Sequence, residues 1–317
     1  MRITVLAGGI GGSRFLLGLR SLGHDITVVV NNGDDITLFG LRVCPDLDTV
    51  MYTLGDGISA ERGWGREDET FRLKDELAAY GAGPSWFGLG DLDLATHIAR
   101  TMWLREGVGL DEVTRRLCDR WQPGVRMLPA TNDEVETHVR LQDGSSVHFQ
   151  EWWVRLHAEV PAQEISLQNA EQARPAPGVV EAIADCDVLL LPPSNPVVSV
   201  GTILAVPGIA EAVRTTAAPV VGVSPIIADA PVRGMADACL SAIGVETTAY
   251  AVGSHYGARS SGGIIDGWLV DDADAAAVDK LAADGVHTRA VPLWMSDIAT
   301  TAAIAEAALD LAAELRG

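Results

Sequence analysis

The chain has 317 residues, of which 48% are hydrophobic, and its 43 acidic against 23 basic side chains give a formal net charge of −20. This composition predicts a globular protein with a well-buried core; the charge excludes a nucleic-acid-binding or anionic-membrane surface, since both need a basic footprint. No apolar run reaches the roughly 18 residues of a membrane span, and the chain enters a predicted strand at once with no signal peptide, so we expect a cytoplasmic protein.

The chain opens with a strand, a glycine-rich loop and a helix. Residues 3–7 are apolar, Gly-Gly-Ile-Gly-Gly-Ser follows at 8–13, and apolar residues then recur at helical spacing before a second apolar strand at 26–30. This βαβ order aims a helix N-terminus at the loop, so Gly9, Gly11 and Gly12 are predicted to present amides to a phosphate. The alternative is a tight turn without a ligand, which needs fewer glycines.

A dinucleotide-binding fingerprint is incomplete in this loop. Its third glycine would fall at Arg14, and the second strand ends in Asn31, where an NAD-binding chain normally carries Asp or Glu. An NAD- or FAD-dependent oxidoreductase is therefore one alternative function. A non-catalytic nucleotide-binding regulator is another, although such a protein has less use for the acidic residues that come next.

Four aspartates follow the second strand within fifteen residues: Asp34, Asp35, Asp46 and Asp48. At the carboxyl edge of a sheet their mutual repulsion calls for a divalent cation. With the family resemblance described below, which implies magnesium, we expect Asp34, Asp35 and Asp48 to be catalytic and to bind this ion, directly or through water. Asp34 and Asp46 can instead be turn and N-cap residues, because residues 45–54 predict a helix with proline in its first turn.

The middle of the chain predicts helices and a hairpin. Helical patterns cover residues 66–80, a segment opening at 90–97, and 110–121; strands are predicted at 125–128, 135–141 and 147–154. Asp93 and His97 share one face of the second helix, and Asp91 is placed to cap it. Such a pair serves acid–base chemistry or is an ordinary surface pair. Trp152 and Trp153 either line a pocket for a planar ring or pack the hairpin.

In the second half an α/β rhythm returns. Apolar strands at 188–191 and 220–223 end in Pro-Pro-Ser-Asn-Pro and Ser-Pro-Ile-Ile, so Ser194, Asn195 and Ser224 are predicted to reach the edge that holds the glycine loop. Each serine alone can instead cap a helix. Further helices are predicted at 179–184, 232–243, 275–283 and 298–315, with strands at 264–269 and 288–291.

These patterns predict one α/β domain over residues 1–317, with a doubly wound, mainly parallel sheet. With the family resemblance described next, we interpret it as a single Rossmann-like transferase domain. A helical and β-hairpin insertion is predicted within it, at residues 55–175.

Six blocks of the sequence resemble the 2-phospho-L-lactate transferase family, whose actinobacterial members act as phosphoenolpyruvate transferases. In single-letter code the blocks are LAGGIGG at 6–12, NNGDD at 31–35, PDLDT at 45–49, GDLDLATH at 90–97, PSNP at 193–196 and VSPI at 223–226. They occur in the family's order and spacing over nearly the whole chain. One departure is Asn32, where many members carry threonine.

The resemblance implies a homodimeric, magnesium-dependent transferase of coenzyme F-420 biosynthesis with a Rossmann-like core. A guanosine diphosphate donor carrying 2-phospholactate or enolpyruvyl phosphate would transfer its phosphoryl-linked acid to the ribityl hydroxyl of the deazaflavin Fo and release GMP. The sequence leaves the choice of donor open. By the same resemblance Ser194, Asn195 and Ser224 would hold the guanosine side, and Asp91 and His97 would position Fo or the donor acid. Asp48 would bind either the metal or Fo.

Overall fold

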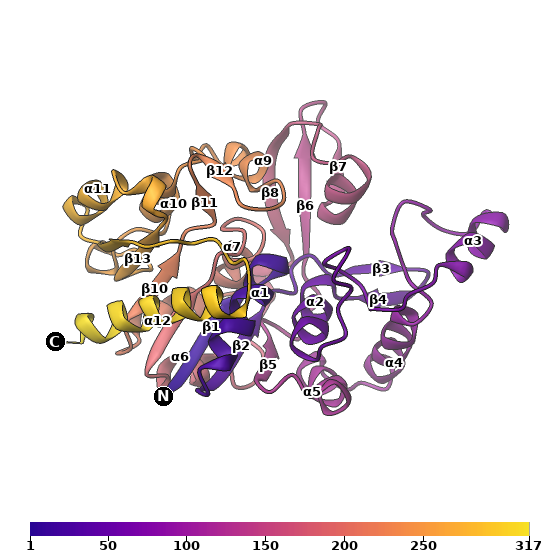
Figure 1. Ribbon diagram of the computed structural model, residues 1–317. Coiled ribbons are helices and arrows are strands. Elements are labelled where there is room, and N and C mark those ends of the chain that lie inside the picture. The colour runs from indigo at the N-terminus through magenta and orange to yellow at the C-terminus, as the bar shows by residue number, and fades with distance from the viewer. Residues whose placement is uncertain (317) are drawn as a thin grey trace.

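A seven-stranded parallel sheet forms the centre of the protein (Figure 1), whose computed structural model describes residues 1–316. In spatial order its strands are β14 (His287–Ala290), β13 (Gly267–Val270), β10 (Val220–Val223), β9 (Val188–Leu191), β1 (Arg2–Ala7), β2 (Asp25–Val30) and β5 (Arg126–Pro129). All neighbouring strands run parallel. The chain adds β2 and β5 on one side of β1 and then continues from β9 on the other, so the predicted doubly wound order is confirmed.

Helices cover both faces of this sheet. One face carries α1 (Gly9–Ser21), α2 (Pro45–Leu54), α5 (Leu110–Trp121) and α12 (Ile298–Leu315); the other carries α6 (Val179–Asp185), α7 (Val200–Ala205), α8 (Ile209–Thr215), α10 (Ala249–Tyr256) and α11 (Ala277–Ala283). Alternate strand residues face opposite layers: Val5 packs with the first set and Leu6 with the second. Burial on both faces explains why the strands read as continuous apolar runs.

The predicted insertion at 55–175 is interrupted by the central sheet. The helices α3 (Arg72–Ala79) and α4 (Asp93–Arg105) come first, but β5 then pairs with β2. A separate antiparallel sheet follows, in the order β7 (Ser146–His148), β6 (Glu136–Leu141) and β8 (Ala162–Gln168). The hairpin is therefore present, but the strand predicted to reach residue 154 is wrong beyond His148, because Glu151–Arg155 form a π-helical turn, η1.

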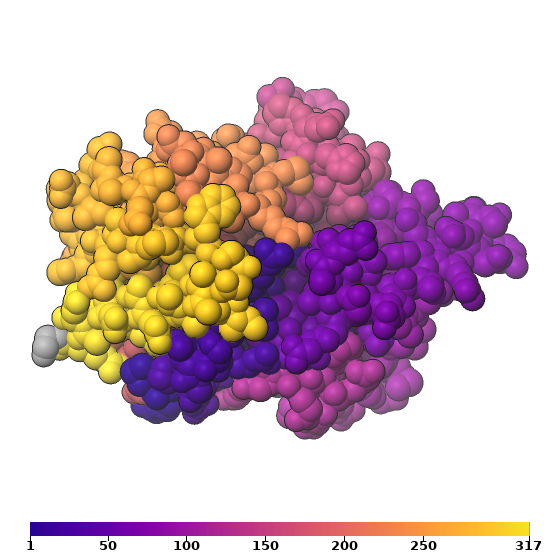
Figure 2. All heavy atoms as spheres, in the orientation of Figure 1, coloured from indigo at the N-terminus to yellow at the C-terminus, as the bar shows by residue number. Residues whose placement is uncertain are grey.

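Small elements complete the rim of the sheet. They are the hairpin β3 (Ile36–Leu38) and β4 (Leu41–Val43), the hairpin β11 (Ile226–Ile227) and β12 (Ala230–Pro231), and helix α9 (Ala236–Ala242). Figure 2 shows a hollow whose floor includes the indigo N-terminal segment, between the yellow C-terminal part and the violet segment that follows α2. No helix within residues 1–316 combines the length and apolar character needed to cross a membrane.

Candidate active site

A cavity of about 890 Å³ opens at the carboxyl edge of the sheet. It is lined by the loop between β1 and α1, by the loops that follow β9 and β10, and by the start of α2. Because β1 and β9 flank the point where the chain reverses its winding, this is the place at which open α/β sheets bind ligands. The predicted residues that line it are Gly9, Gly11, Asp34, Asp48, His97, Ser194, Asn195 and Ser224.

The glycine loop lets two segments of backbone approach closely. Helix α1 begins at Gly9, whose φ of +63° favours glycine. A Cβ on Gly11 would overlap the carbonyl oxygen of Pro193, and a Cβ on Gly12 would overlap the hydroxyl of Ser194. Gly12 does not line the cavity, so its role is to admit the Ser194 loop rather than to face a ligand.

The polar residues after β9 and β10 fix their own loops. The Ser194 hydroxyl donates to the carbonyl of Gly8 (2.8 Å), and the Asn195 side-chain oxygen accepts from the amide of Val197 (2.9 Å). The Ser224 hydroxyl likewise donates to the carbonyl of Ile226 (2.9 Å). These side chains therefore shape the cavity wall, much as the capping alternative predicts.

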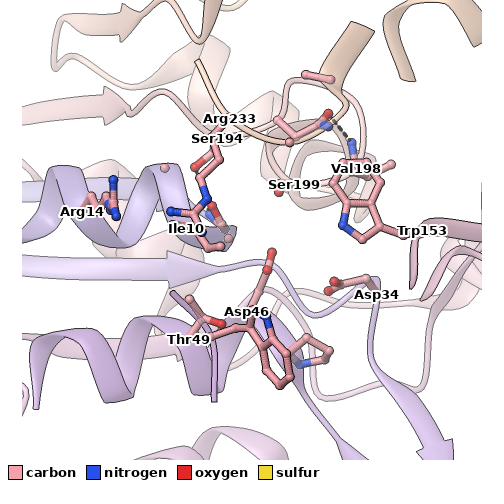
Figure 3. Close-up of a pocket in the computed structure, with 18 of the residues that line it drawn as sticks. Ile10, Arg14, Asp34, Asp46, Thr49, Trp153, Ser194, Val198, Ser199 and Arg233 are labelled. Atoms are coloured by element: carbon pink, nitrogen blue, oxygen red, sulfur yellow. Dashed lines mark hydrogen bonds between the residues drawn. The ribbon is translucent and has the colours of Figure 1, made fainter. Parts of the chain in front are cut away.

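Asp34 and Asp46 form an acidic pair that points into the cavity (Figure 3). The side-chain amide of Asn31 donates to both carboxylates, at 3.0 Å to Asp34 and 2.9 Å to Asp46. Gln150 donates to the other oxygen of Asp34 at 2.7 Å. Burial, followed by the charge of Asp46, raises the pKa of Asp34 well above its usual value, and burial raises the pKa of Asp46 to about 6.

This acidic pair fits a magnesium ion. Neither carboxylate is in an ion pair within residues 1–316, although both are buried. Two buried carboxylates sharing one amide donor repel each other unless they are protonated or bind a cation. Carboxylate oxygens are the ligands that magnesium prefers, and few protein ligands suffice because the ion keeps several waters. Asp34 and Asp46 are therefore the residues that would hold it.

The raised pKa values make the effect of magnesium depend on pH. At pH values between its ordinary pKa and about 6, the Asp46 carboxyl is protonated to a greater extent in the folded protein than in the unfolded chain. The free energy of unfolding of the metal-free protein therefore falls as pH rises through this window. Magnesium competes with that proton. We expect Mg²⁺ to raise the melting temperature at about pH 7.5 and to have little effect at about pH 5. Differential scanning fluorimetry measures this, and an equal shift at both values would contradict it.

Asp35 does not join Asp34 in the cavity, which corrects the expectation that both face one metal. Its side chain is fully buried on the other side of the chain, 3.7 Å from the Nε atom of Arg42. Burial raises the pKa of Asp35 to about 7, against the opposing charge of Arg42. Asp34 belongs to a turn, whereas Asp35 leads directly into β3, so the two neighbouring carboxylates have different surroundings.

Asp48 belongs to a buried network on the neighbouring wall. Its Oδ1 atom accepts from Arg100, and its Oδ2 atom lies 3.7 Å from Nδ1 of His97. The other ring nitrogen of His97 is 3.3 Å from Asp93, whose second oxygen accepts from the hydroxyl of Tyr52 (2.7 Å). Arg100 already balances the charge of Asp48, but the ligand atoms of Asp48, Asp93 and His97 lie within 4.8 Å of one another and could hold a metal ion. The Oδ2 atom of Asp48 is buried and has no hydrogen-bond partner within the described residues.

Asp91 lies outside the cavity, contrary to its predicted substrate-binding role. Its exposed carboxylate accepts from Thr70 and from the amide of Leu73, in the first turn of α3. The start of α4, which the sequence assigned to Asp91, is capped instead by Glu69, which accepts from the amides of Leu92 and Asp93. The segment before α3 folds back and brings Glu69 to α4.

Sequence reasoning missed several residues that line the cavity. Trp153 lines it, whereas Trp152 is buried and donates to the carbonyl of Val160, because the η1 turn separates the two rings. Other residues without a predicted role are Arg14, Trp64, Phe149, Arg233 and Trp294. For Arg14 a signal was present, since it stands where the dinucleotide fingerprint would carry glycine.

Fold and site together define a Rossmann-like α/β protein with a cavity at its topological switch point. The model of the family described as 2-phospho-L-lactate transferase CofD matches residues 3–302. The chain belongs to this family and is a transferase.

Similar proteins are named as transferases of the same kind, and a similar solved structure has the same fold. The chain is 64% identical to the phosphoenolpyruvate transferase of Streptomyces coelicolor, over 100% of this chain and 99% of that one. It is 60% identical to that of Thermobifida fusca (100% and 99%) and 55% identical to that of Mycobacterium sp. strain JLS (98% and 99%). A crystal structure of a UPF0052 family protein from Bacillus halodurans superimposes with a TM-score of 0.65 at 18% identity, covering 97% and 98% of the chains, and shares the fold.

Proposed function

We propose that this protein is a transferase of coenzyme F-420 biosynthesis that moves an enolpyruvyl phosphate or 2-phospholactate group from a guanosine diphosphate donor to the deazaflavin Fo. GMP is the second product, and magnesium is the cofactor. Family membership and the names of the relatives support the reaction class. One structural observation carries the rest: Asp34 and Asp46 share the amide of Asn31, form no ion pair within the described residues and line the same cavity as the glycine loop, against which Asp46 lies.

In this reaction a ribityl oxygen of Fo bonds to the phosphorus that bears the acid, and the bond from that phosphorus to the GMP oxygen breaks. Asp34 and Asp46 would hold magnesium, whose charge would supply neutralisation of the diphosphate. The loop at Gly9 and Gly11 would present backbone amides to the same diphosphate. Asp48 would take the hydroxyl proton on Oδ2, while Arg100 holds that carboxylate in place.

Aromatic side chains give the cavity an apolar wall that suits a planar ring. Phe149 and Trp153 lie with their ring centres 5.3 Å apart, and Phe87 and Trp294 also line the cavity. A deazaflavin is flat and largely apolar on its faces, so stacking on these rings would place it. This observation favours Fo as the acceptor.

The assay combines purified protein, Fo, Mg²⁺ and either the lactyl or the enolpyruvyl donor, and follows product mass and GMP. The products of the two donors differ by two hydrogens, so mass spectrometry identifies the donor used. Coenzyme F-420 without glutamates, or its dehydro form, is expected together with equal GMP. Binding without product would favour a regulator, and a co-purified nicotinamide or flavin would favour an oxidoreductase.

We also propose that the enzyme acts as a homodimer in the cytoplasm, as the sequence resemblance implies. Light scattering coupled to size-exclusion chromatography measures the molar mass directly. A mass of one chain at working concentration would contradict the dimer.

A further inference from the structure

Two arginines line the cavity without acidic partners. Arg14 lies on α1, one turn after the glycine loop, and Arg233 lies in the segment between β12 and α9. In Figure 3 Arg14 and Asp34 lie on opposite sides of the view. The two cations line the same cavity as the acidic pair.

Acidic side chains outnumber basic ones in this protein, which has a formal net charge of −20. Many of its arginines form ion pairs, including Arg42, Arg100 and Arg115. Neither Arg14 nor Arg233 is in an ion pair within residues 1–316.

Their other contacts leave both guanidinium groups free to bind an anion. Arg233 lines the cavity and donates one hydrogen bond, to the carbonyl of Arg62 (3.2 Å). Both arginines line one cavity, and partial burial, followed by the charge of Arg14, lowers the pKa of Arg233. Such a pair is stabilised by an anion that both can reach.

One anionic group of the donor remains for Arg14 and Arg233 to bind. This inference rests on the function proposed above, in which the diphosphate would bind the glycine loop and the magnesium ion held by Asp34 and Asp46. The remaining anion of the donor is the carboxylate of its lactyl or enolpyruvyl group. A planar guanidinium fork matches a planar carboxylate in two parallel hydrogen bonds.

We propose that Arg14 and Arg233 bind the carboxylate of the transferred acid and so distinguish the donor from unsubstituted GDP. The amides and the metal site would recognise a diphosphate with or without the acid. Selectivity for the acid-bearing donor therefore depends on these two side chains.

The test is calorimetric titration of Arg14→Gln, Arg233→Gln and the double variant with GDP-linked lactate and with GDP, in Mg²⁺ without Fo. For each single variant we expect Kd for GDP-linked lactate to rise about tenfold, while Kd for GDP changes less than about twofold. The lysine variants should recover part of the loss. Arg115→Gln, on the exposed face of α5, is the control and should match the wild type.

Equal weakening for both ligands would assign the arginines to the diphosphate and overturn the proposal, as would unchanged affinity for both. Turnover of the wild type with Fo is measured on the same preparation. Absent product there would count against the proposed function, whereas the role of the arginines is judged from the ratio of the two Kd values.

Discussion

Asp34→Asn is expected to lower the rate of transfer by about 10²–10³-fold, because it removes a charge from the pair that would hold magnesium against the diphosphate. Asp34 lies in the cavity and shares its amide donor, Asn31, with Asp46. Steady-state kinetics with saturating Mg²⁺ and Fo measure the effect, and circular dichroism confirms that the variant is folded.

The neighbouring residue provides the matched control for this experiment. Asp35→Asn changes the same kind of side chain one position along, but Asp35 faces Arg42 outside the cavity. We expect it to keep kcat within about threefold of the wild type while its melting temperature changes, since a buried charge pair is altered. A large loss of kcat in Asp35→Asn with none in Asp34→Asn would reverse the assignment.

Arg100→Met is expected to lower the free energy of unfolding by about 3–5 kcal/mol, because it leaves the buried Asp48 carboxylate without its cation. Arg100 is 1% exposed, and its guanidinium also contacts Nδ1 of His97 at 3.1 Å. Urea denaturation followed by tryptophan fluorescence measures the loss.

A second substitution separates the charge from the packing. In the double variant Arg100→Met with Asp48→Asn, no unpaired charge remains, so most of the lost stability should return. Arg115→Met, in an exposed ion pair on α5, should change stability by less than about 1 kcal/mol. A double variant as unstable as Arg100→Met would show that lost packing, not charge, is responsible.

The central fold could be predicted from the sequence because its signals are local. Strands β9 and β10 are short continuous apolar runs, and helices α2, α5 and α12 have clear periodicity; all five were predicted with their observed bounds. Strand β8 was missed because Ala162–Gln168 is half-exposed and lies between prolines. Its strand character depends on pairing with β6, which no local pattern records.

The site was predicted only in part, because it depends on contacts between distant segments. The glycine loop and Asp34 were placed correctly at the sheet edge. The partner of Asp34 is Asp46 rather than Asp35, because α2 turns back and brings its first turn against Asn31. Which helix a carboxylate caps is likewise a tertiary matter, and the positions of Glu69 and Asp91 follow from how the segment before α3 folds back.

In the proposed mechanism Asp34 and Asp46 hold a divalent cation at the cavity, beside the diphosphate of the donor. The most direct measurement is the binding of Mn²⁺, as a paramagnetic substitute for Mg²⁺, followed by electron paramagnetic resonance in the presence of GDP. We predict that Asp34→Asn and Asp46→Asn each weaken Mn²⁺ binding by at least about tenfold, while Asp35→Asn binds it like the wild type. Wild-type affinity in both cavity variants, or a loss confined to Asp35→Asn, would contradict the account.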